Sequence, residues 1–282
     1  MSAKAQNFEF ERTGDFVQSL ARGLSVLRAF DRDHPSLSLA AIAARTGLSR
    51  AAARRLVLTL QHLGYLRAVR REFTLAPRVL ELGFAYLGSL NLTEFAQPWM
   101  ETLSRQVDES CSMAVLDGQS IVYVARVPVR KVMTVSLGVG ARLPAFCSSM
   151  GRVLLAGLTD SELSAWLTTS PLPRQTDFTI VDPDDLRRAI GQVRDQGFAY
   201  VEQELELGLC SIAAPVRNRD GRVAAALNIG MRFHAGAQRH AVEVLAPALR
   251  EIAGAIEHSA PPDWLPAVSV EDVLAERRAL TA

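Results

Sequence analysis

The chain of 282 residues lacks the features of a secreted or membrane-spanning protein. It has three cysteines, Cys111, Cys147 and Cys210, an odd number without CxxC spacing, which favours neither a disulfide framework nor a zinc site. No run approaches the roughly 18 consecutive apolar residues of a membrane span, and the first residues lack the charged-then-apolar order of a signal peptide. We therefore expect a cytoplasmic protein with reduced cysteines and no membrane contact.

Motifs of common enzyme classes are missing as well. The sequence contains no nucleophile elbow, no HExxH, no Walker loop and no GxGxxG after an expected strand. Its five histidines are scattered, so neither a catalytic triad nor a metal site is visible. We expect no catalytic residue, no metal and no cofactor. An enzyme acting through the C-terminal half is the alternative, and turnover of a bound acid would reveal it.

The charges that are present divide unevenly along the chain. Residues 16–78 contain 11 arginines against 3 acidic residues, whereas residues 79–282 contain 18 basic against 24 acidic residues, although the net charge is only +1. A small basic block beside a larger acidic one is typical of a polyanion-binding domain joined to a domain that binds something else. The length also favours two domains, and nucleic acid is the partner expected for the first.

The basic block has the pattern of a helix-turn-helix. Apolar steps of three and four predict helices over residues 17–31 and 48–63, and Ser38 is the expected N-cap of a short helix that ends before Gly47. The residues expected to face inward on the two longer helices are Val17, Leu20, Leu24, Leu27, Phe30, Ala53, Leu56, Leu60 and Leu63. A short turn with glycine between two helices is the DNA-binding form of this motif, and it places the second helix in the major groove.

The open face of that second helix is rich in arginine. Arginine can contact guanine O6 and N7 through two hydrogen bonds, and small residues can meet a phosphate or a thymine methyl group. We assign Arg50, Ala51 and Arg54 to base edges and Ser49 to a phosphate or a base. Arg55 is assigned to DNA too, with a clamp on the fold as its alternative.

Two short strand-like runs, residues 65–68 and 72–75, predict a tight hairpin after this helix. Such a hairpin would be a wing, and its Arg67, Arg70 and Arg71 are expected to contact the backbone or the minor groove. A lone arginine is more often a solvated charge. Eleven arginines in one winged pattern favour DNA binding instead.

The remaining chain predicts a connector followed by a mixed domain. Two helical stripes meet near residues 88–93, and they form either a linker with a core helix or a connector that pairs two chains. We favour a homodimer, because two half-sites need two reading heads, and leave a homotetramer open. Period-two runs predict strands at 112–116, 120–127, 133–137, 198–202, 210–216 and 223–229, with the first two and the last two joined as hairpins. Helices are expected at 148–156, 160–168, 184–195 and 242–256. The last one has Val242 at the start of its inward apolar stripe and is disturbed by Pro247.

This order of elements argues an α+β fold with a largely antiparallel sheet flanked by helices. Residues 260–282 resemble an appended tail, with a short helix expected over 270–278 and no function that the sequence shows.

Several runs resemble the IclR family of bacterial transcription factors. They are LARGLSVLRAF, LSLAAIAARTGLSRAAARRLVLTLQHLGYL, LPAFCSSMGRVLLAGL and ELELGLCSIAAPVRNRDGRVAAALNIG, and together they cover about residues 16–258. The stretches AAARR, RVLELG, SMGRVLLAGL and QELELGL resemble the subgroup that controls the β-ketoadipate pathway. The resemblance implies an N-terminal tail (1–15), a winged helix-turn-helix domain (16–78), a linker helix (79–92), a GAF-like effector-binding domain (93–258) and a C-terminal tail (259–282).

The resemblance also implies a pocket for a small carboxylate between a helix N-terminus and the sheet. Free N–H groups and the helix dipole favour an anion there. The positions that match the family's pocket are Ser148, Ser149, Met150, Gly151, Glu204, Ser211 and Asn228, with Arg126 as a carboxylate clamp. Taken singly these residues have ordinary alternatives: Ser149 as an N-cap only, Asn228 as a partner of backbone groups, and Arg126 or Arg142 as a surface charge.

The sequence therefore predicts a ligand-responsive regulator that binds double-stranded operator DNA. Its expected effector is a small aromatic or dicarboxylic acid, and the expected target is an aromatic-acid catabolic operon, activated rather than repressed. A repressor of another carboxylate operon, an enzyme and a pure interaction module are the alternatives.

Overall fold

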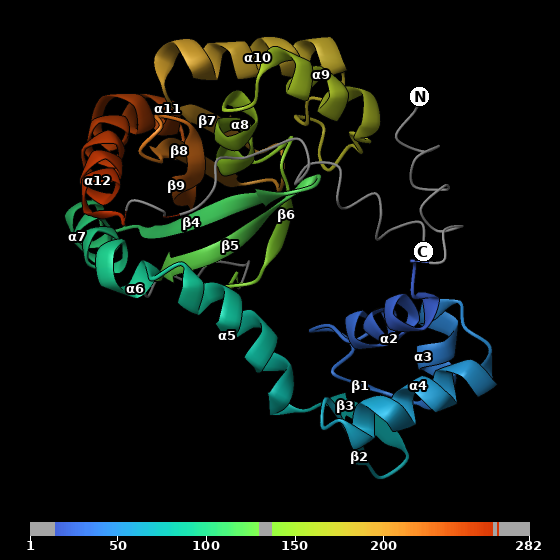
Figure 1. Ribbon diagram of the computed structural model, residues 1–282. Coiled ribbons are helices and arrows are strands. Elements are labelled where there is room, and N and C mark those ends of the chain that lie inside the picture. The colour runs from blue at the N-terminus through green and yellow to red at the C-terminus, as the bar shows by residue number, and fades with distance from the viewer. Residues whose placement is uncertain (1–14, 130–136, 262–263, 265–282) are drawn as a thin grey trace. The chain divides into compact units, whose positions relative to one another are not determined.

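The computed structural model describes residues 15–129, 137–261 and 264 (Figure 1). The chain divides between Tyr86 and Leu87 into two compact units, within helix α5 (Leu80–Ser89). No helix in the described residues is both long and apolar enough to cross a membrane. Three predicted segments lie outside the described residues. They are the N-terminal tail except for residue 15, the strand at 133–137 except for residue 137, and the helix at 270–278.

The first unit contains three helices and a small antiparallel sheet. The helices are α2 (Gln18–Arg28), α3 (Leu39–Thr46) and α4 (Arg50–His62); the strands are β1 (Ser36–Leu37), β2 (Leu66–Val69) and β3 (Glu72–Leu75), and a 3-10 turn spans Pro77–Val79. β2 and β3 form the predicted hairpin, with Val69 opposite Glu72 and a positive φ of 56° at Arg70. β1 pairs with β3 and was not predicted, because two residues carry no period. The unit is a winged helix-turn-helix.

The helix-turn-helix is fixed by caps that the sequence predicts. The Ser38 side chain accepts a hydrogen bond from Ala41 N, and the Ser49 side chain accepts one from Ala52 N, so each helix begins one residue later. Gly47 ends α3 with φ 67°, a left-handed conformation that L-residues with a side chain rarely adopt. These caps set the sharp turn that presents α4.

The core of this unit corrects part of the predicted apolar faces. In α2 the buried residues lie at its C-terminal end, and Val17, Leu20 and Leu24 are exposed. In α4 Val57 is buried and Leu63 is exposed. The cluster under these helices consists of Val26, Ala29, Phe30, Leu37, Ile42, Val57, Leu60 and Leu66. The apolar stripe at the start of α2 therefore has no cover among the described residues.

The second unit is built on a six-stranded antiparallel sheet of order β6-β5-β4-β9-β8-β7. Its strands are β4 (Ser110–Asp117), β5 (Ser120–Val127), β6 (Arg142–Pro144), β7 (Ala199–Glu202), β8 (Leu209–Arg217) and β9 (Val223–Arg232). The predicted hairpins turn at Gly118 and near Gly221, both with positive φ. The expected antiparallel α+β architecture is confirmed, with β6 as an additional edge strand.

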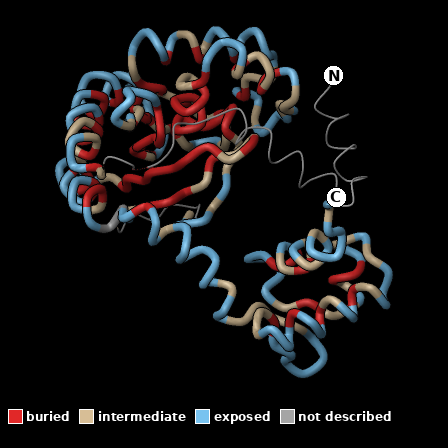
Figure 2. Tube along the Cα trace, in the orientation of Figure 1, coloured by how far each residue is buried: buried red, intermediate tan, exposed pale blue. Residues whose placement is uncertain are grey.

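Two layers of helices cover the two faces of this sheet (Figures 1 and 2). One face packs against α7 (Gln97–Val107) and α12 (Ala246–Ser259) through residues such as Met113, Ile212 and Leu227. The other face packs against α8 (Ser149–Ala156), α9 (Asp160–Thr169) and α10 (Pro183–Gln196). Small residues such as Ala213 and Ala226 face α8, which brings that helix close to the sheet.

Proline resets the helical phase at two places. Before Pro247 the chain forms α11 (Ala237–His240) and a π turn (Ala241–Leu245), and α12 then begins with Pro247 in its first turn, where no N–H is required. The predicted inward position of Val242 is therefore wrong, since it is 41% exposed. After α6 (Leu92–Phe95), α7 likewise has Pro98 in its first turn. It buries Met100, whereas Trp99, which the apolar spacing of this segment places on the inward stripe, is 38% exposed.

Candidate DNA-binding surface and effector pocket

The predicted DNA contacts of α4 lie together at its N-terminal end. Ser49 is the N-cap, and Arg50, Ala51, Arg54 and Arg55 are all exposed. Within the described chain the three guanidinium groups have no recorded hydrogen-bond or ion-pair partner, so the alternative of Arg55 as a clamp on the fold is not what the structure shows. Three unpaired cations on one exposed helix face form a surface suited to a polyanion.

Other arginines of the same unit hold the fold instead. Arg45 forms an ion pair with Asp31, with 2.6 Å between Nη2 and Oδ2, and its Nε donates to Ala29 O at 2.9 Å. Arg78 donates from Nη1 to Leu63 O at 2.9 Å. The charge excess of residues 16–78 therefore overstates what is free for a partner.

The wing carries its three predicted arginines on an exposed hairpin. Arg70 and Arg71 form the two-residue turn between β2 and β3. Arg67 lies opposite Thr74 on the pairing strands and donates from Nε to its Oγ1 at 3.0 Å. Arg67 is thus partly engaged, while the turn residues project from the unit.

In the second unit a recess, partly open to solvent, lies between the sheet and the start of α8. It is lined by Ser110, Ser112, Tyr123, Arg126, Leu137, Leu143, Cys147, Ser148, Ser149, Met150, Val201, Gln203, Glu204, Leu205, Leu209, Ser211, Asn228 and Gly230. Seven of the eight predicted effector residues are in this set, and the exception is Gly151. The resemblance missed Ser110, Ser112 and Tyr123. Alternation along β4 could have indicated the two serines, whereas Tyr123 shares the recess with Arg126 because the β4–β5 pairing shifts register between them.

The floor of the recess is a polar row across three strands. Strand register sets Arg126 of β5 opposite Ser112 of β4, and Ser112 opposite Asn228 of β9. Arg126 Nη1 lies 3.5 Å from Ser112 Oγ, and no ion pair of Arg126 is recorded within the described chain. Arg126, the predicted carboxylate clamp, is therefore a cation on the floor of the recess. Arg142, which was considered beside it, pairs with Asp117 outside the recess.

In this row the side-chain oxygen of Asn228 has no hydrogen-bond partner among the described residues. The residue is 7% exposed, and its buried Oδ1 accepts no hydrogen bond within the described chain. The alternative that Asn228 satisfies backbone groups is therefore wrong. A buried polar atom without a partner costs about 1–3 kcal/mol, which favours a polar ligand or water at this place.

The N-terminal turn of α8 closes one side of the recess. Ser148 is the N-cap and accepts from Gly151 N at 3.2 Å, while Ser149 Oγ accepts from Ser211 Oγ at 2.8 Å. The first N–H groups of any helix have no acceptor inside that helix. Ser149 is consequently both a helix residue and a bridge to the sheet, and the turn offers partial positive charge to the recess.

Gly151 has a packing role rather than a place in the lining. A Cβ built on it would lie 2.0 Å from Ala145 O and 2.4 Å from Ala145 Cα. The helix therefore approaches the preceding backbone as closely as it does only because residue 151 has no side chain. Its prediction as a ligand contact is corrected to a residue that positions α8.

Glu204 lines the recess, but its charge is already paired. Its Oε2 lies 2.6 Å from Arg152 Nη2, and the two side chains are 8% and 6% exposed. The same oxygen accepts a hydrogen bond from Ile180 N at 3.2 Å. Sequence reasoning placed Glu204 near the ligand and could not supply its partner, which lies 52 residues away in the chain.

Two ionisable groups in the recess stay neutral. Burial raises the pKa of the Cys147 thiol to about 12 and that of the Tyr123 phenol to about 12, with the charge of Arg126 acting weakly against the burial of Tyr123. At physiological pH Cys147 is a protonated thiol, which is a poor nucleophile and a poor metal ligand. In the described residues no group of three or more His, Cys, Asp or Glu side chains is arranged to hold a metal ion.

A winged helix-turn-helix with free arginines, followed by an α+β unit with a polar recess, defines a DNA-binding transcriptional regulator. Residues 19–70 match the model of the IclR helix-turn-helix domain, and residues 84–258 match the model described as bacterial transcriptional regulator IclR C-terminal. The chain therefore belongs to the IclR family of bacterial transcriptional regulators, which confirms the resemblance seen in its sequence.

Its relatives include regulators of aromatic catabolism. The chain is 47% identical over 216 residues to the Pca regulon regulatory protein of Pseudomonas putida, covering 76% of this chain and 74% of that protein. It is 36% identical to the p-hydroxybenzoate hydroxylase transcriptional activator of Acinetobacter baylyi, covering 88% and 93%. A solved IclR homolog of Microbacterium hydrocarbonoxydans in complex with 4-hydroxybenzoate aligns with TM-score 0.73 and 30% identity, covering 86% and 98%.

Proposed function

We propose that this chain binds a small aromatic carboxylic acid in the recess of its second unit and, in response, controls transcription of an aromatic-acid catabolic operon. One observation carries the proposal: three features converge on one recess. Among the described residues they are an arginine without an ion pair, a buried amide oxygen without a partner, and a helix N-terminus. The named functions of the relatives support the chemical class of the effector. The p-hydroxybenzoate relative is an activator, which supports activation over repression.

The winged helix-turn-helix unit, the DNA-reading head of the chain, places α4 in the major groove of operator DNA. Arg50, Ala51 and Arg54 face base edges, Ser49 and Arg55 face the edge of the groove, and the wing arginines contact the backbone. Base contacts by arginine supply sequence choice, whereas the wing supplies affinity that falls as salt rises. Residues 16–78 form this head, residues 79–92 the linker helix, and residues 93–258 the effector domain, with tails on both sides.

In the recess the acid lies between the sheet and α8. The carboxylate takes the cationic end, formed by Arg126 together with the N-terminal turn of Ser148, Ser149 and Met150. Asn228 and Ser211 bind the other polar substituents of the ring, and the apolar lining packs against its faces. Recognition of this kind needs one charged group and a few placed polar groups, which the recess provides.

Two exposed apolar faces support a homodimer as the working form. The stripe Val17, Leu20 and Leu24 on α2 is uncovered, as are Leu80 and Phe84 on α5. Apolar residues gathered on one helix face are typical of a surface that a second copy covers. A dimer presents two heads to two half-sites, and equilibrium sedimentation distinguishes it from a monomer or a tetramer.

The effector assignment predicts a stabilisation that depends on the acid. At 100 times its dissociation constant a bound acid stabilises the folded chain by about 2.7 kcal/mol, because it binds the folded state only. Differential scanning fluorimetry against benzoate, 4-hydroxybenzoate, protocatechuate and adipate measures this as a rise in Tm. Arg126→Gln should reduce the rise, and Arg142→Gln is the control with its ion pair outside the recess. Stabilisation by none of the four acids contradicts this assignment.

The regulatory assignment is tested with DNA from the chain's own upstream region. Fluorescence anisotropy should show binding at physiological salt that an unrelated duplex does not compete away, together with a change in affinity when the acid is added. Equal competition by both duplexes would contradict sequence-specific regulation. Turnover of the acid would favour the enzyme alternative.

A further inference from the structure

The recess wall contains an acid that an anionic effector would meet. Glu204 lies in the β7–β8 connection, and its side chain is 8% exposed and lines the recess. Two like charges close together in a buried site disfavour each other strongly, because little water screens them. A bare carboxylate here would therefore weaken the binding of any carboxylate ligand.

Arg152 lies behind this wall and supplies the compensating charge. Its Nη2 donates to Glu204 Oε2 at 2.6 Å, and its Nε donates to Phe146 O at 3.2 Å. These two bonds fix the position of the guanidinium. Arg152 itself lies in α8, one turn after the residues that line the recess. Arg152 is not part of the lining itself, so it acts on a ligand only through Glu204.

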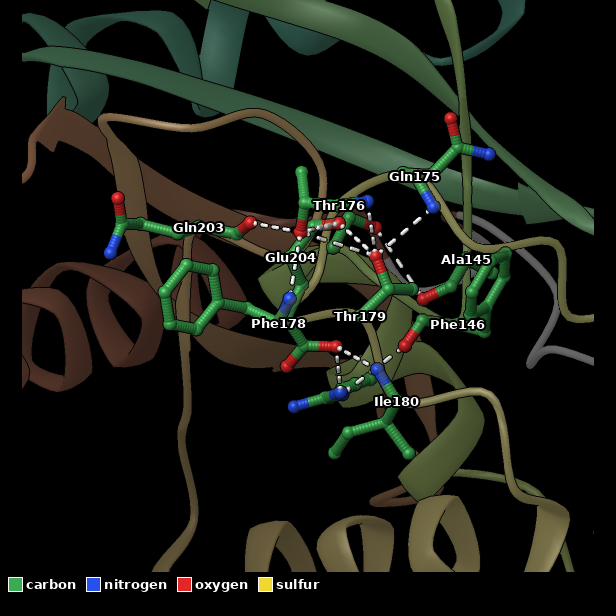
Figure 3. A network of polar contacts seen from close by, with 11 residues as sticks. Ala145, Phe146, Gln175, Thr176, Phe178, Thr179, Ile180, Gln203 and Glu204 are labelled. Carbon is green, nitrogen blue, oxygen red and sulfur yellow. Dashed lines mark hydrogen bonds and ion pairs between the residues drawn. The ribbon is translucent and has the colours of Figure 1, made fainter.

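A third segment fixes the same acid in place, as Figure 3 shows. Ile180 N donates to Glu204 Oε2 at 3.2 Å, Thr179 Oγ1 donates to Glu204 O at 2.7 Å, and Thr176 Oγ1 donates to Gln203 O at 2.6 Å. The carboxylate is thus held on its Arg152 side by both a cation and a backbone N–H. Glu204 therefore keeps its position in the wall of the recess while its negative charge is neutralised.

We propose that Arg152 is a positioning residue that makes the recess permissive for anions. It neutralises Glu204 and holds it as a wall, which leaves Arg126 and the α8 N-terminus to attract the effector carboxylate. This inference rests on the proposed function, because it requires a carboxylate ligand in the recess. It assigns Glu204 to the shape of the recess rather than to the ligand's charge.

The test compares a charged ligand with its neutral analogue in four full-length proteins. The probes are the tightest-binding acid of the four-acid panel and its primary amide, each titrated by calorimetry into wild type, Glu204→Gln, Arg152→Met and the double variant. The measured quantity is the amide Kd divided by the acid Kd. We expect Glu204→Gln to raise this ratio and Arg152→Met to lower it, each on the order of tenfold, with the double variant near wild type.

A purely structural role would change both ligands together and leave the ratio constant. A constant ratio in proteins that bind the acid overturns the inference and leaves the proposed function standing. If Arg152→Met does not fold, the ratios of the other three proteins still test the inference. Of these three, only Glu204→Gln leaves an uncompensated charge, so only its ratio should rise above that of wild type. If no acid binds wild type, the proposed function fails and this inference falls with it.

Discussion

Replacing Arg50 and Arg54 by glutamine should lower operator affinity by about 10²- to 10³-fold or more at physiological salt. Both side chains are exposed on α4 and have no recorded partner within the described chain, so their removal costs the fold little. Each good arginine contact to a guanine contributes about 1–3 kcal/mol of discrimination, and two such losses at separate positions roughly add. Fluorescence anisotropy with operator and unrelated duplexes measures both affinity and specificity.

The controls separate base reading from general charge. Arg188→Gln removes an exposed arginine of α10 and should leave operator affinity unchanged. Arg70→Gln, on the wing, should weaken operator and unrelated DNA alike and reduce the slope of log affinity against log salt by about one. Unchanged operator occupancy after loss of both Arg50 and Arg54 would contradict the assignment of α4 as the reading helix.

Local signals were enough to predict most of the reading head. Ser38, Gly47 and Ser49 act through backbone groups within three or four residues, so their caps can be inferred from neighbouring sequence alone. The hairpin turns at Arg70 and Gly118 are equally local. The predictions for these elements agree with the structure because residues far away in the sequence do not determine their conformation.

Helix phase and burial could not be predicted in the same way. Apolar spacing identified α2 correctly, yet only the packing of the neighbouring helices decides that Val26 is inside and Leu20 outside. At Pro247 the sequence indicated a disturbed helix, and the structure resolves the disturbance as a π turn followed by a new helix. A proline shows where a helix must change and leaves the new phase to tertiary contacts.

The recess shows the same division between residue identity and role. The family resemblance predicted Ser211 and Asn228, and strand register explains why they share a face with Arg126. The roles of Glu204 and Gly151 depend on Arg152 and Ala145, contacts that no periodic pattern reveals. Motifs therefore located this region, whereas the partners that decide its charge and shape required the structure.

Gly151→Ala should destabilise the second unit by about 3 kcal/mol, the upper part of the range for overpacked cores. The added Cβ would lie 2.0 Å from Ala145 O, and backbone cannot yield as the end of a long side chain can. The helix must then move away from the backbone at Ala145. Thermal unfolding should show a Tm lower by about 6–12 °C for a unit of this size.

The matched control is the same substitution where the space is free. Gly191 lies inside α10, and a Cβ there meets no atom within 4 Å. Gly191→Ala should stabilise by about 0.5–1 kcal/mol, because alanine loses less conformational freedom in a helix than glycine. Gly151→Ala should also weaken binding of the acid, since Ser149 and Met150 lie on the same turn, whereas Gly191→Ala should not. Equal and small Tm changes for the two variants would show that α8 can relax, and Gly151 would then have no part in shaping the recess.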